Sequence, residues 1–441
     1  GTFGVNQRPL ILIDNMEVST DDLARIPVDD IASFSILRDA TASAVYGSRG
    51  ANGVILVTTK LGKEGTPKIT FRAEQRLSSP TDMPKIADPV TFMKMHNEAV
   101  LTRDPLALTP YTDEKIAMTA SGADPIQYPA VDWLSEVTKP NTRTQNYNLS
   151  ISGGGQVASY LVSGNLTQDD GLIRVNPINN FNNNVDFKVY NLRSNININV
   201  TKSTQLMVRA IANYRNYSGP PEGGSSSFRN ALRANPALFQ PVYQVGPQQS
   251  YIQHPLFGNY EDGSGNLYLN PYANIVRGYS EWSESNMQVQ IELKQDLSQW
   301  VEGLSYRGLA NASRGAYMEY RRQYNPFYYT PTSIDPNTGQ YSYLNLNPLG
   351  GTEYLDYSDN GRGQESLFYM ENAINYARTF QDKHSVTGML ISTIRNRITL
   401  PRDVVGNVIN TLPYRNASFS GNFTYVYDNR YHAQFTFGYN G

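Results

Sequence analysis

An alternation of apolar and polar residues recurs from Thr144 to the end of the chain, and it constrains the fold more than any other feature. In the clearest segment, 287–293, Met, Val, Ile and Leu occupy every second position and Gln, Gln and Glu stand between them. A period of two is that of a β-strand whose two faces meet different surroundings. We count about eleven such strands, each near the ~9–11 residues that cross a bilayer at a tilt. They lie near 68–77, 144–152, 160–166, 196–200, 206–214, 287–294, 304–310, 368–376, 386–394, 419–427 and 433–439.

The connections between these strands alternate between short and long. Long ones, rich in Pro, Gly, Tyr and Asn, cover 218–281, 315–364 and 401–415, and a helix is predicted within an earlier one at 88–101. Brief turns on one side and large loops on the other are typical of bacterial outer-membrane barrels. A soluble β-sandwich would alternate similarly but would not carry loops of about 50 residues on one side only. The short connections are centred on Gly153, Lys202, Ser298, Asp382 and Asp428.

Composition excludes several classes of protein. The 441 residues carry a net charge of −2 with scattered Lys and Arg, which argues against a nucleic-acid partner. Cysteine is absent, so the chain has neither disulfides nor thiolate metal sites. The 31 tyrosines against 3 tryptophans fit the composition of a membrane barrel. No signal peptide is recognisable at the N-terminus and the chain ends inside an alternating segment, so we expect an internal piece of a longer polypeptide.

Residues 28–62 predict a compact mixed α/β unit. The apolar cluster at 31–37 is short enough for one buried strand. Asp39 stands at a helix N-cap position and 40–46 favours a short helix. The β-branched run 54–57 predicts a second buried strand, and 9–14 an earlier one.

The amino-acid sequence of this unit is distinctive. The segments LRDATASAVYGSRGANGVILVTTKLGKEG and PLILIDNMEV closely resemble the plug-domain signature of the SusC/RagA family of TonB-dependent outer-membrane transporters. A looser resemblance continues through 147–166 and the Asp132–Trp133 pair. The resemblance implies a transmembrane antiparallel β-barrel of about 22 strands with an α/β plug domain in its lumen. Residues 1–67 would be the C-terminal part of the plug, and 68–441 the N-terminal half of the barrel with long extracellular loops.

The same resemblance implies a function. Such a protein imports an oligomeric nutrient, a glycan or a peptide, and is not an enzyme. Its expected partners are a SusD-like surface lipoprotein acting as a lid, TonB with its inner-membrane motor, and the lipid bilayer with its lipopolysaccharide. No cofactor or metal is expected. Two alternatives stay open: a siderophore or cobalamin receptor without a lid, and a surface adhesion or structural barrel.

Five charged residues are candidates for a lock between plug and barrel. In TonB-dependent transporters generally, plug arginines pair with glutamates on the inner barrel wall. The candidates on the plug are Arg38, Asp39 and Arg49, and strand parity places Glu292 and Glu371 on the lumen side. Pairing of Arg49 with carbonyl groups of the plug itself is the alternative.

A group of aromatic residues in the predicted loop 315–364 is the candidate for substrate contact. Aromatic faces beside Asn and Arg suit sugar rings or peptide side chains. Contact with a partner protein or with the bilayer interface is the competing interpretation. The residues are Tyr317, Tyr320, Tyr324, Phe327, Tyr328 and Tyr329.

No arrangement of catalytic residues is recognisable. The Gly153–Gly155 run lacks the lysine and helix of a phosphate-binding loop and predicts a turn. The histidines are isolated in sequence and are expected to be ordinary polar residues: His96, His254, His384 and His432.

Overall fold

The computed structural model describes residues 9–14, 16–18, 20, 23, 26, 30–37, 52–246, 249–400 and 411–441. Its main feature is an 11-stranded sheet, called the wall below, in which every neighbouring pair of strands is antiparallel. The expectation of about eleven strands is therefore confirmed. The strands, in spatial and sequence order, are β5 (Gly65–Ser78), β6 (Thr142–Gly154), β7 (Ala158–Asp170), β8 (Asp186–Asn199), β9 (Thr204–Gly219), β12 (Gly278–Asp296), β13 (Leu304–Gln323), β16 (Asp356–Phe380), β17 (His384–Leu400), β18 (Tyr414–Tyr427) and β19 (Tyr431–Asn440).

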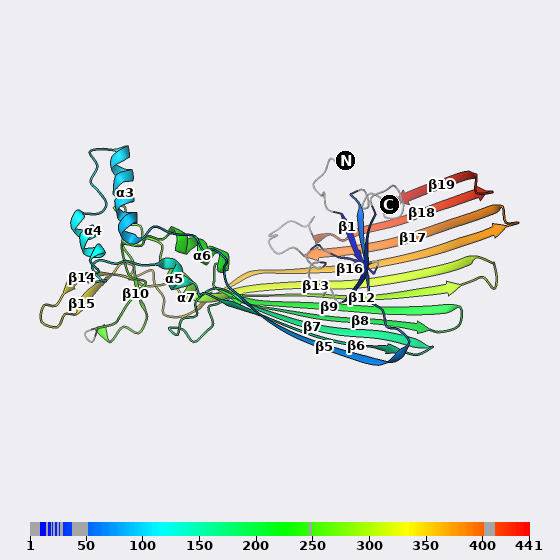
Figure 1. The fold of residues 1–441 in the computed structure, drawn as a ribbon, viewed down its shortest axis with the longest axis horizontal. Helices are drawn as coiled ribbons and strands as arrows, with labels where there is room; N and C mark the ends of the chain where they lie inside the picture. Colours follow the sequence, from blue (N-terminus) through cyan, green and yellow to red (C-terminus); the bar gives the residue numbers. More distant parts are fainter. Residues whose placement is uncertain are drawn as a thin grey trace.

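Short and long connections lie at opposite ends of the wall (Figure 1). The β16–β17 and β18–β19 hairpins turn through pairs of residues with positive φ, Gln381–Asp382 and Asp428–Asn429. Two such residues in succession match the twist of the flanking strands, and Asp and Asn tolerate this conformation better than most residues. The predicted turns at Asp382 and Asp428 are confirmed, as is the alternation of connection lengths.

The strands are longer than their alternating segments. Residues 315–323 and 356–364, assigned to a loop from the sequence, extend β13 and β16 and pair across the two strands, for example Ala316 with Gln364. That loop boundary is wrong because backbone pairing continues beyond the point where every second side chain is apolar. The connection proper is residues 324–355.

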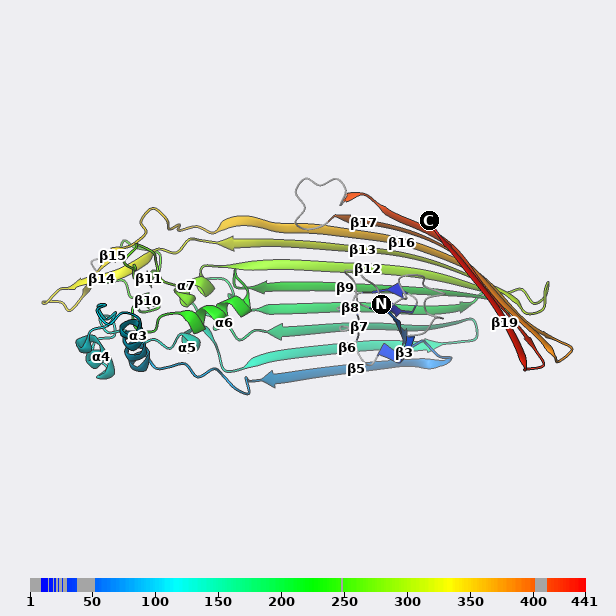
Figure 2. The same ribbon diagram turned by 90° about the horizontal axis from the view of Figure 1, so that it is seen from above.

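The described residues of three long connections, 79–141, 220–277 and 324–355, fold together into one lobe beyond the ends of the wall strands (Figures 1 and 2). It consists of the small sheet β10-β11-β14-β15 and helices α3 to α7. The helix predicted at 88–101 is confirmed as α3, with Asp88 accepting the N–H groups of Val90 and Thr91 at 3.0 Å. The elements are α3 (Pro89–Arg103), α4 (Asp113–Ala120), α5 (Trp133–Val137), α6 (Gly224–Arg233), β10 (Val242–Tyr243), β11 (Leu256–Gly258), α7 (Pro271–Val276), β14 (Tyr328–Ile334) and β15 (Tyr341–Asn345).

The lobe has its own apolar core. Trp133 of α5 is buried against Phe239, and its indole Nε1 donates to the Asn235 carbonyl oxygen at 2.9 Å. The neighbouring Asp132 caps α5 by accepting the Ser135 N–H. Phe257 of β11 and the apolar side of α7 complete the cluster, so connections far apart in sequence share one core.

A separate four-stranded sheet, β2-β1-β4-β3, packs against one face of the wall and is called the plug sheet after the domain predicted there. β1 (Leu10–Ile13) and β4 (Val54–Thr59) confirm the strands predicted at 9–14 and 54–57; they pair in parallel and form the core of the sheet. β2 (Met16–Glu17) and β3 (Ile31–Leu37) are the edges. Burial of β3 was wrongly predicted: Phe34 is 66% exposed, because β3 pairs only with β4 and no other described element covers it. The predicted helix at 40–46 lies outside the described residues. No helix in the described part of the chain is long and apolar enough to cross a membrane.

Candidate functional site: the contact between plug sheet and wall

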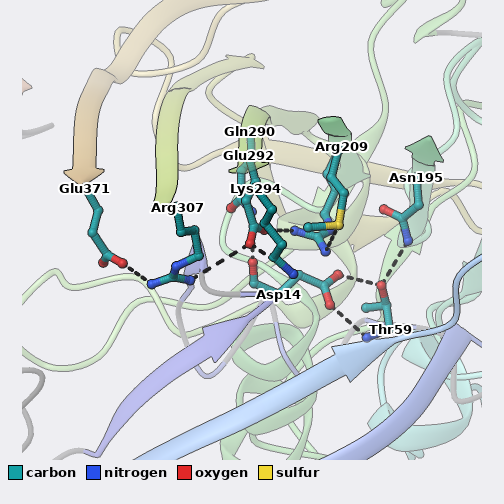
Figure 3. Close-up of polar contacts among 10 residues, drawn as sticks. Asp14, Thr59, Asn195, Arg209, Gln290, Glu292, Lys294, Arg307 and Glu371 are labelled. Atoms are coloured by element: carbon teal, nitrogen blue, oxygen red, sulfur yellow. Dashed lines mark hydrogen bonds and ion pairs between the residues drawn. The ribbon is translucent and has the colours of Figure 1, made fainter. Parts of the chain in front are cut away.

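A buried chain of hydrogen bonds joins the plug sheet to strand β8 (Figure 3). Asp14, just after β1, accepts the backbone N–H of Thr59 at 2.9 Å and also the Thr59 hydroxyl. Asn195 of β8 donates from Nδ2 to the Thr59 hydroxyl oxygen and to the Lys60 carbonyl oxygen, both at 3.0 Å. Thr59 and Asn195 are each 1% exposed, so water does not compete for these groups.

Strand β12 adds a second contact at the same place. Gln290, fully buried, donates from Nε2 to the carbonyl oxygen of Asp14 at 3.1 Å. Asp14 therefore meets the wall directly through its backbone and indirectly through Thr59 (Figure 3). We call Asp14, Thr59, Asn195 and Gln290 the latch.

Asp30 makes a further contact, near the start of β3. Its carboxylate accepts the Ser163 hydroxyl at 3.0 Å and lies 4.0 Å from Nη1 of Arg193. All three side chains are buried. A charge this deep needs a partner of opposite sign, because an unpaired ion in the protein interior is costly.

A further contact is the ion pair between Glu17 of β2 and Arg395 of β17, at 2.9 Å. Among these contacts between plug sheet and wall, it involves the wall strand nearest the C-terminus. It borders a cleft of about 480 Å³ between plug sheet and wall. Tyr317 is among the cleft residues, and the charged groups there are of both signs, with Glu284 and Glu365 beside Arg397. The cleft is thus a polar space that opens where the plug sheet meets the wall.

The wall glutamates predicted for the lock pair with arginines of the wall itself. Glu292 lies 3.0 Å from Nη1 of Arg209 and 4.0 Å from Arg307, and Glu371 pairs with Arg307 (Figure 3). Glu292 shares the plug-facing parity of Gln290, as the alternation indicated. The other members of the lock, Arg38, Asp39 and Arg49, lie outside the described residues, so the lock stays a prediction.

Sequence reasoning missed the residues that form the latch. The parity that selected Glu292 places Gln290 on the same face, and Asn195 alternates with Ile196. The signal was therefore available. Charge drew attention to the glutamates, whereas the wall residues of the latch are neutral amides.

Four of the six predicted substrate-contact residues pack inside the lobe. Tyr324 and Tyr328 lie against the cluster around Trp133, and burial raises the pKa of both phenols. Phe327 stacks on His254 with ring centroids 4.3 Å apart. The Tyr329 hydroxyl is 2.7 Å from Nε2 of the same histidine.

The remaining two aromatic residues lie on β13. Tyr317 lines the cleft beside Glu17, while the Tyr320 hydroxyl donates to Glu281. Substrate contact by any of the six stays a prediction. Among the described residues, no group of three or more His, Asp and Glu side chains is placed to hold a metal ion.

Comparison with known proteins agrees with this architecture. Residues 1–54 match the model of the TonB-dependent receptor plug domain. TonB-dependent receptor P39 of Formosa agariphila is 26% identical over 391 residues, which cover 88% of this chain and 31% of that protein. TonB-dependent receptor SusC of Bacteroides thetaiotaomicron is 25% identical over 208 residues, 44% of this chain and 19% of that protein.

The solved structures give the fold. The RagAB peptide transporter superposes with a TM-score of 0.64 at 17% identity, covering 100% of this chain and 49% of that one. The chain thus spans about half of that structure, and about a third or less of the curated relatives. The plug match, the receptor relatives and the shared fold place the chain in the SusC/RagA-type family of TonB-dependent transporters, plug-and-barrel proteins of the bacterial outer membrane.

Proposed function

We propose that the protein containing this chain imports an oligomeric nutrient, a glycan or a peptide, across the outer membrane in a TonB-dependent way. Residues 1–67 serve as part of the plug and 68–441 as the first half of the barrel, with the long connections outside the cell. The observation that carries the proposal is the nature of the contact between plug sheet and wall: it is buried and polar. We infer that such a contact is separable.

Separability follows from the kinds of group involved. The apolar core of the plug sheet, Leu10, Leu12 and Val54 with their neighbours, contains no wall residue among those described. The hydrogen bonds between plug sheet and wall are individually modest, because a typical hydrogen bond adds only about 0.5–1.5 kcal/mol net. A pull on the plug would therefore exchange latch hydrogen bonds for water without breaking a packed core.

Two buried or partly buried glutamates of the wall have ion-pair partners that do not depend on the plug sheet. Glu292 and Glu371 keep their arginine partners on neighbouring strands when the plug sheet leaves. At these two positions the wall would then present paired charges, which cost less to expose or rebury than unpaired ones. If Arg38 or Arg49 also reaches these glutamates, as the lock requires, it shares them with Arg209 and Arg307.

Partners and substrate are inferred from the relatives and the lobe. SusC and the RagAB peptide transporter favour a SusD-like lipoprotein lid, and the plug model favours TonB as the source of force. The packed lobe gives such a lid a firm surface on the side of the long connections. Tyr317, at the cleft, is the best placed of the predicted aromatic residues to meet a passing sugar ring or peptide side chain.

A reducible tether tests the proposal. Thr59 and Asn195 are replaced by cysteine together, in a chain that has no other cysteine, and joined by a short bis-methanethiosulfonate cross-linker in whole cells. We expect uptake of a labelled oligosaccharide or oligopeptide mixture to stop on cross-linking and to return with reductant. Thr393 and Ser418, whose hydroxyls meet across β17 and β18, form the matched control pair within the wall. That tether leaves uptake unchanged.

The outcomes separate the alternatives. Undiminished uptake with the Thr59–Asn195 tether in place would contradict movement of the plug sheet. Tether-sensitive uptake of a ferric chelate, with none of either mixture, would favour the siderophore receptor. Absence of any uptake, with cell attachment lost on deletion of the gene, would favour the adhesion barrel.

A further inference from the structure

The face of the wall that points away from the plug sheet carries a continuous apolar row across six strands. Register pairs Phe71 with Leu149, Leu149 with Gly164, Gly164 with Leu192, Leu192 with Ala212 and Ala212 with Met287. The large side chains of this row are exposed, from 45% at Leu149 to 66% at Phe71. Such a row on an outer-membrane barrel faces lipid.

Two positions leave this row incomplete. Gly164 has no side chain, and a Cβ built on it would meet no atom within 4 Å. Ala212 contributes only a methyl group, while Leu149, Leu192 and Met287 stand beside the two small residues. The result is an apolar hollow of about 420 Å³ in the outer surface. Its size falls in the range of small-molecule pockets.

On the side of the hollow nearer the long connections, successive rows of outward-facing residues become more polar. The next row contains Tyr147, Tyr190 and Tyr214, and the rings of the last two lie 6.0 Å apart. Tyrosines of this kind mark the level of the lipid headgroups. One row further on the residues are polar: Gln145, Gln168, Lys188 and Asn216.

The opposite direction stays mainly apolar. Ile151, Val162 and Ala210 form the row on the side of the short turns. The hollow therefore lies just inside the tyrosine row, in the half of the apolar band nearer the long connections. A flexible hydrocarbon chain that enters the bilayer beside those tyrosines reaches it directly.

We propose that the hollow at Gly164 and Ala212 is a binding site for one acyl chain of lipopolysaccharide. Hydrocarbon is the matching chemistry, because the lining residues of the outer face are aliphatic or aromatic and offer no charge. Four asparagines also border the hollow, but they alternate with the outer-face residues and so belong to the opposite face of the wall: Asn148, Asn165, Asn191 and Asn213. Lipopolysaccharide is the occupant because the long connections are extracellular in the proposed function, on which this assignment rests. The headgroup would lie level with the tyrosine row and near Lys188.

Filling the hollow tests the proposal. Gly164→Leu puts a branched side chain into open space without a steric clash at Cβ. The intact protein is extracted from outer membranes in mild detergent, and native mass spectrometry measures the fraction that retains one lipopolysaccharide. We expect most of the retention to be lost, because the leucine side chain occupies the space of the acyl chain and removes its van der Waals contacts with the lining side chains.

Ala310→Leu is the matched control. Ala310 lies on the same outer face, between Ile291 and Met370, and is not part of the hollow. It adds one carbon fewer than Gly164→Leu and the same bulk as Ala212→Leu, and it leaves lipopolysaccharide retention unchanged. Heat-dependent gel migration checks that each barrel is folded, and Ala212→Leu replaces Gly164→Leu if that variant fails to fold.

The result that overturns the proposal is equal lipopolysaccharide retention in wild type and Gly164→Leu. Retention of phospholipid in its place, or a hollow-dependent pairing of two copies, would also overturn it. Nutrient uptake, measured in parallel, distinguishes this site from the import function: the hollow and the latch lie on opposite faces, so Gly164→Leu leaves uptake unchanged. Lost uptake with retained lipopolysaccharide would contradict the assignment.

Discussion

The lobe and the contact between plug sheet and wall are both buried, yet they are held by different forces. The lobe closes around Trp133, Phe239 and Phe257, which are at most 3% exposed. The plug sheet is attached through Asn195, Gln290 and other polar groups. Apolar packing depends on close fit and is lost in large steps, whereas hydrogen bonds can be exchanged for water one at a time. The difference separates a fixed scaffold, the lobe, from a contact that is released in the proposed function.

The largest effect is expected from Trp133→Ala in the lobe. It empties the centre of the core and leaves the Asn235 carbonyl without its indole donor, so the lobe should lose about 3–5 kcal/mol. Hydrogen exchange of residues 224–276 measures the loss. Trp300→Ala, at a position 75% exposed in a short turn, is the control and should change little. Exchange as slow as in wild type would show that Trp133 does not hold the lobe together.

A smaller effect is expected at the latch. Asn195→Leu deprives the Thr59 hydroxyl and the Lys60 carbonyl of their donor and should weaken plug attachment by about 1–3 kcal/mol. Hydrogen exchange of β4 gives the measurement, and lobe exchange should stay the same. Asn197→Leu, on the same strand and face, is the control, since the described residues show no hydrogen bond from it to the plug sheet.

Gln290→Leu sharpens this prediction. Gln290 and Asn195 meet the same Asp14–Thr59 pair, so a double-mutant cycle should show coupling between them. Strictly additive effects on β4 exchange would mean that the two amides hold the plug sheet independently and that the latch is not one unit.

Prediction from sequence succeeded where one physical rule dominates. Alternation revealed the wall strands, because every second residue faces a different medium, and glycine, Asp and Asn marked the tight turns. It failed in the lobe: residues 324–355 look like a polar loop, yet Tyr324 and Tyr328 belong to a core completed by residues about 50 to 200 positions away. Such a core has no local period. The latch was missed for a different reason, since neutral amides such as Asn195 and Gln290 differ little in sequence from the many other amides of the strands.

Alkaline pH offers a third test of the comparison. Burial, with the Glu136 carboxylate nearby, raises the pKa of Tyr272 in the lobe to about 12. Below about pH 10 its phenol is neutral in both the folded and the unfolded lobe, so its contribution to stability is complete. Between about pH 10 and about 12 the phenol ionises only when unfolded, and lobe stability falls as pH rises.

The pH test compares denaturant midpoints of the lobe at pH 9 and pH 11, followed through Trp133 fluorescence. The midpoint should drop at the higher pH, and Tyr272→Phe should reduce the drop. Tyr354→Phe, at a residue 68% exposed, is the control and should leave the drop as in wild type. A drop of the same size in Tyr272→Phe would assign the pH sensitivity to other buried phenols of the lobe.

The smallest effect is expected from Glu17→Gln, which removes the one charge that β2 offers to Arg395. The pair is partly exposed, with side-chain exposures of 32% for Glu17 and 13% for Arg395, so its net contribution should be only about 0.2–1 kcal/mol. It should also shrink as salt rises, unlike the buried latch. Exchange of β1 at low and high salt measures both points, and Glu74→Gln, whose partner Arg72 lies on the same wall strand, is the control. If Glu17→Gln released the plug sheet more readily than Asn195→Leu, ion pairs and not amide hydrogen bonds would hold the plug sheet. The proposed lock of charged residues would then be the better explanation of the attachment than the latch.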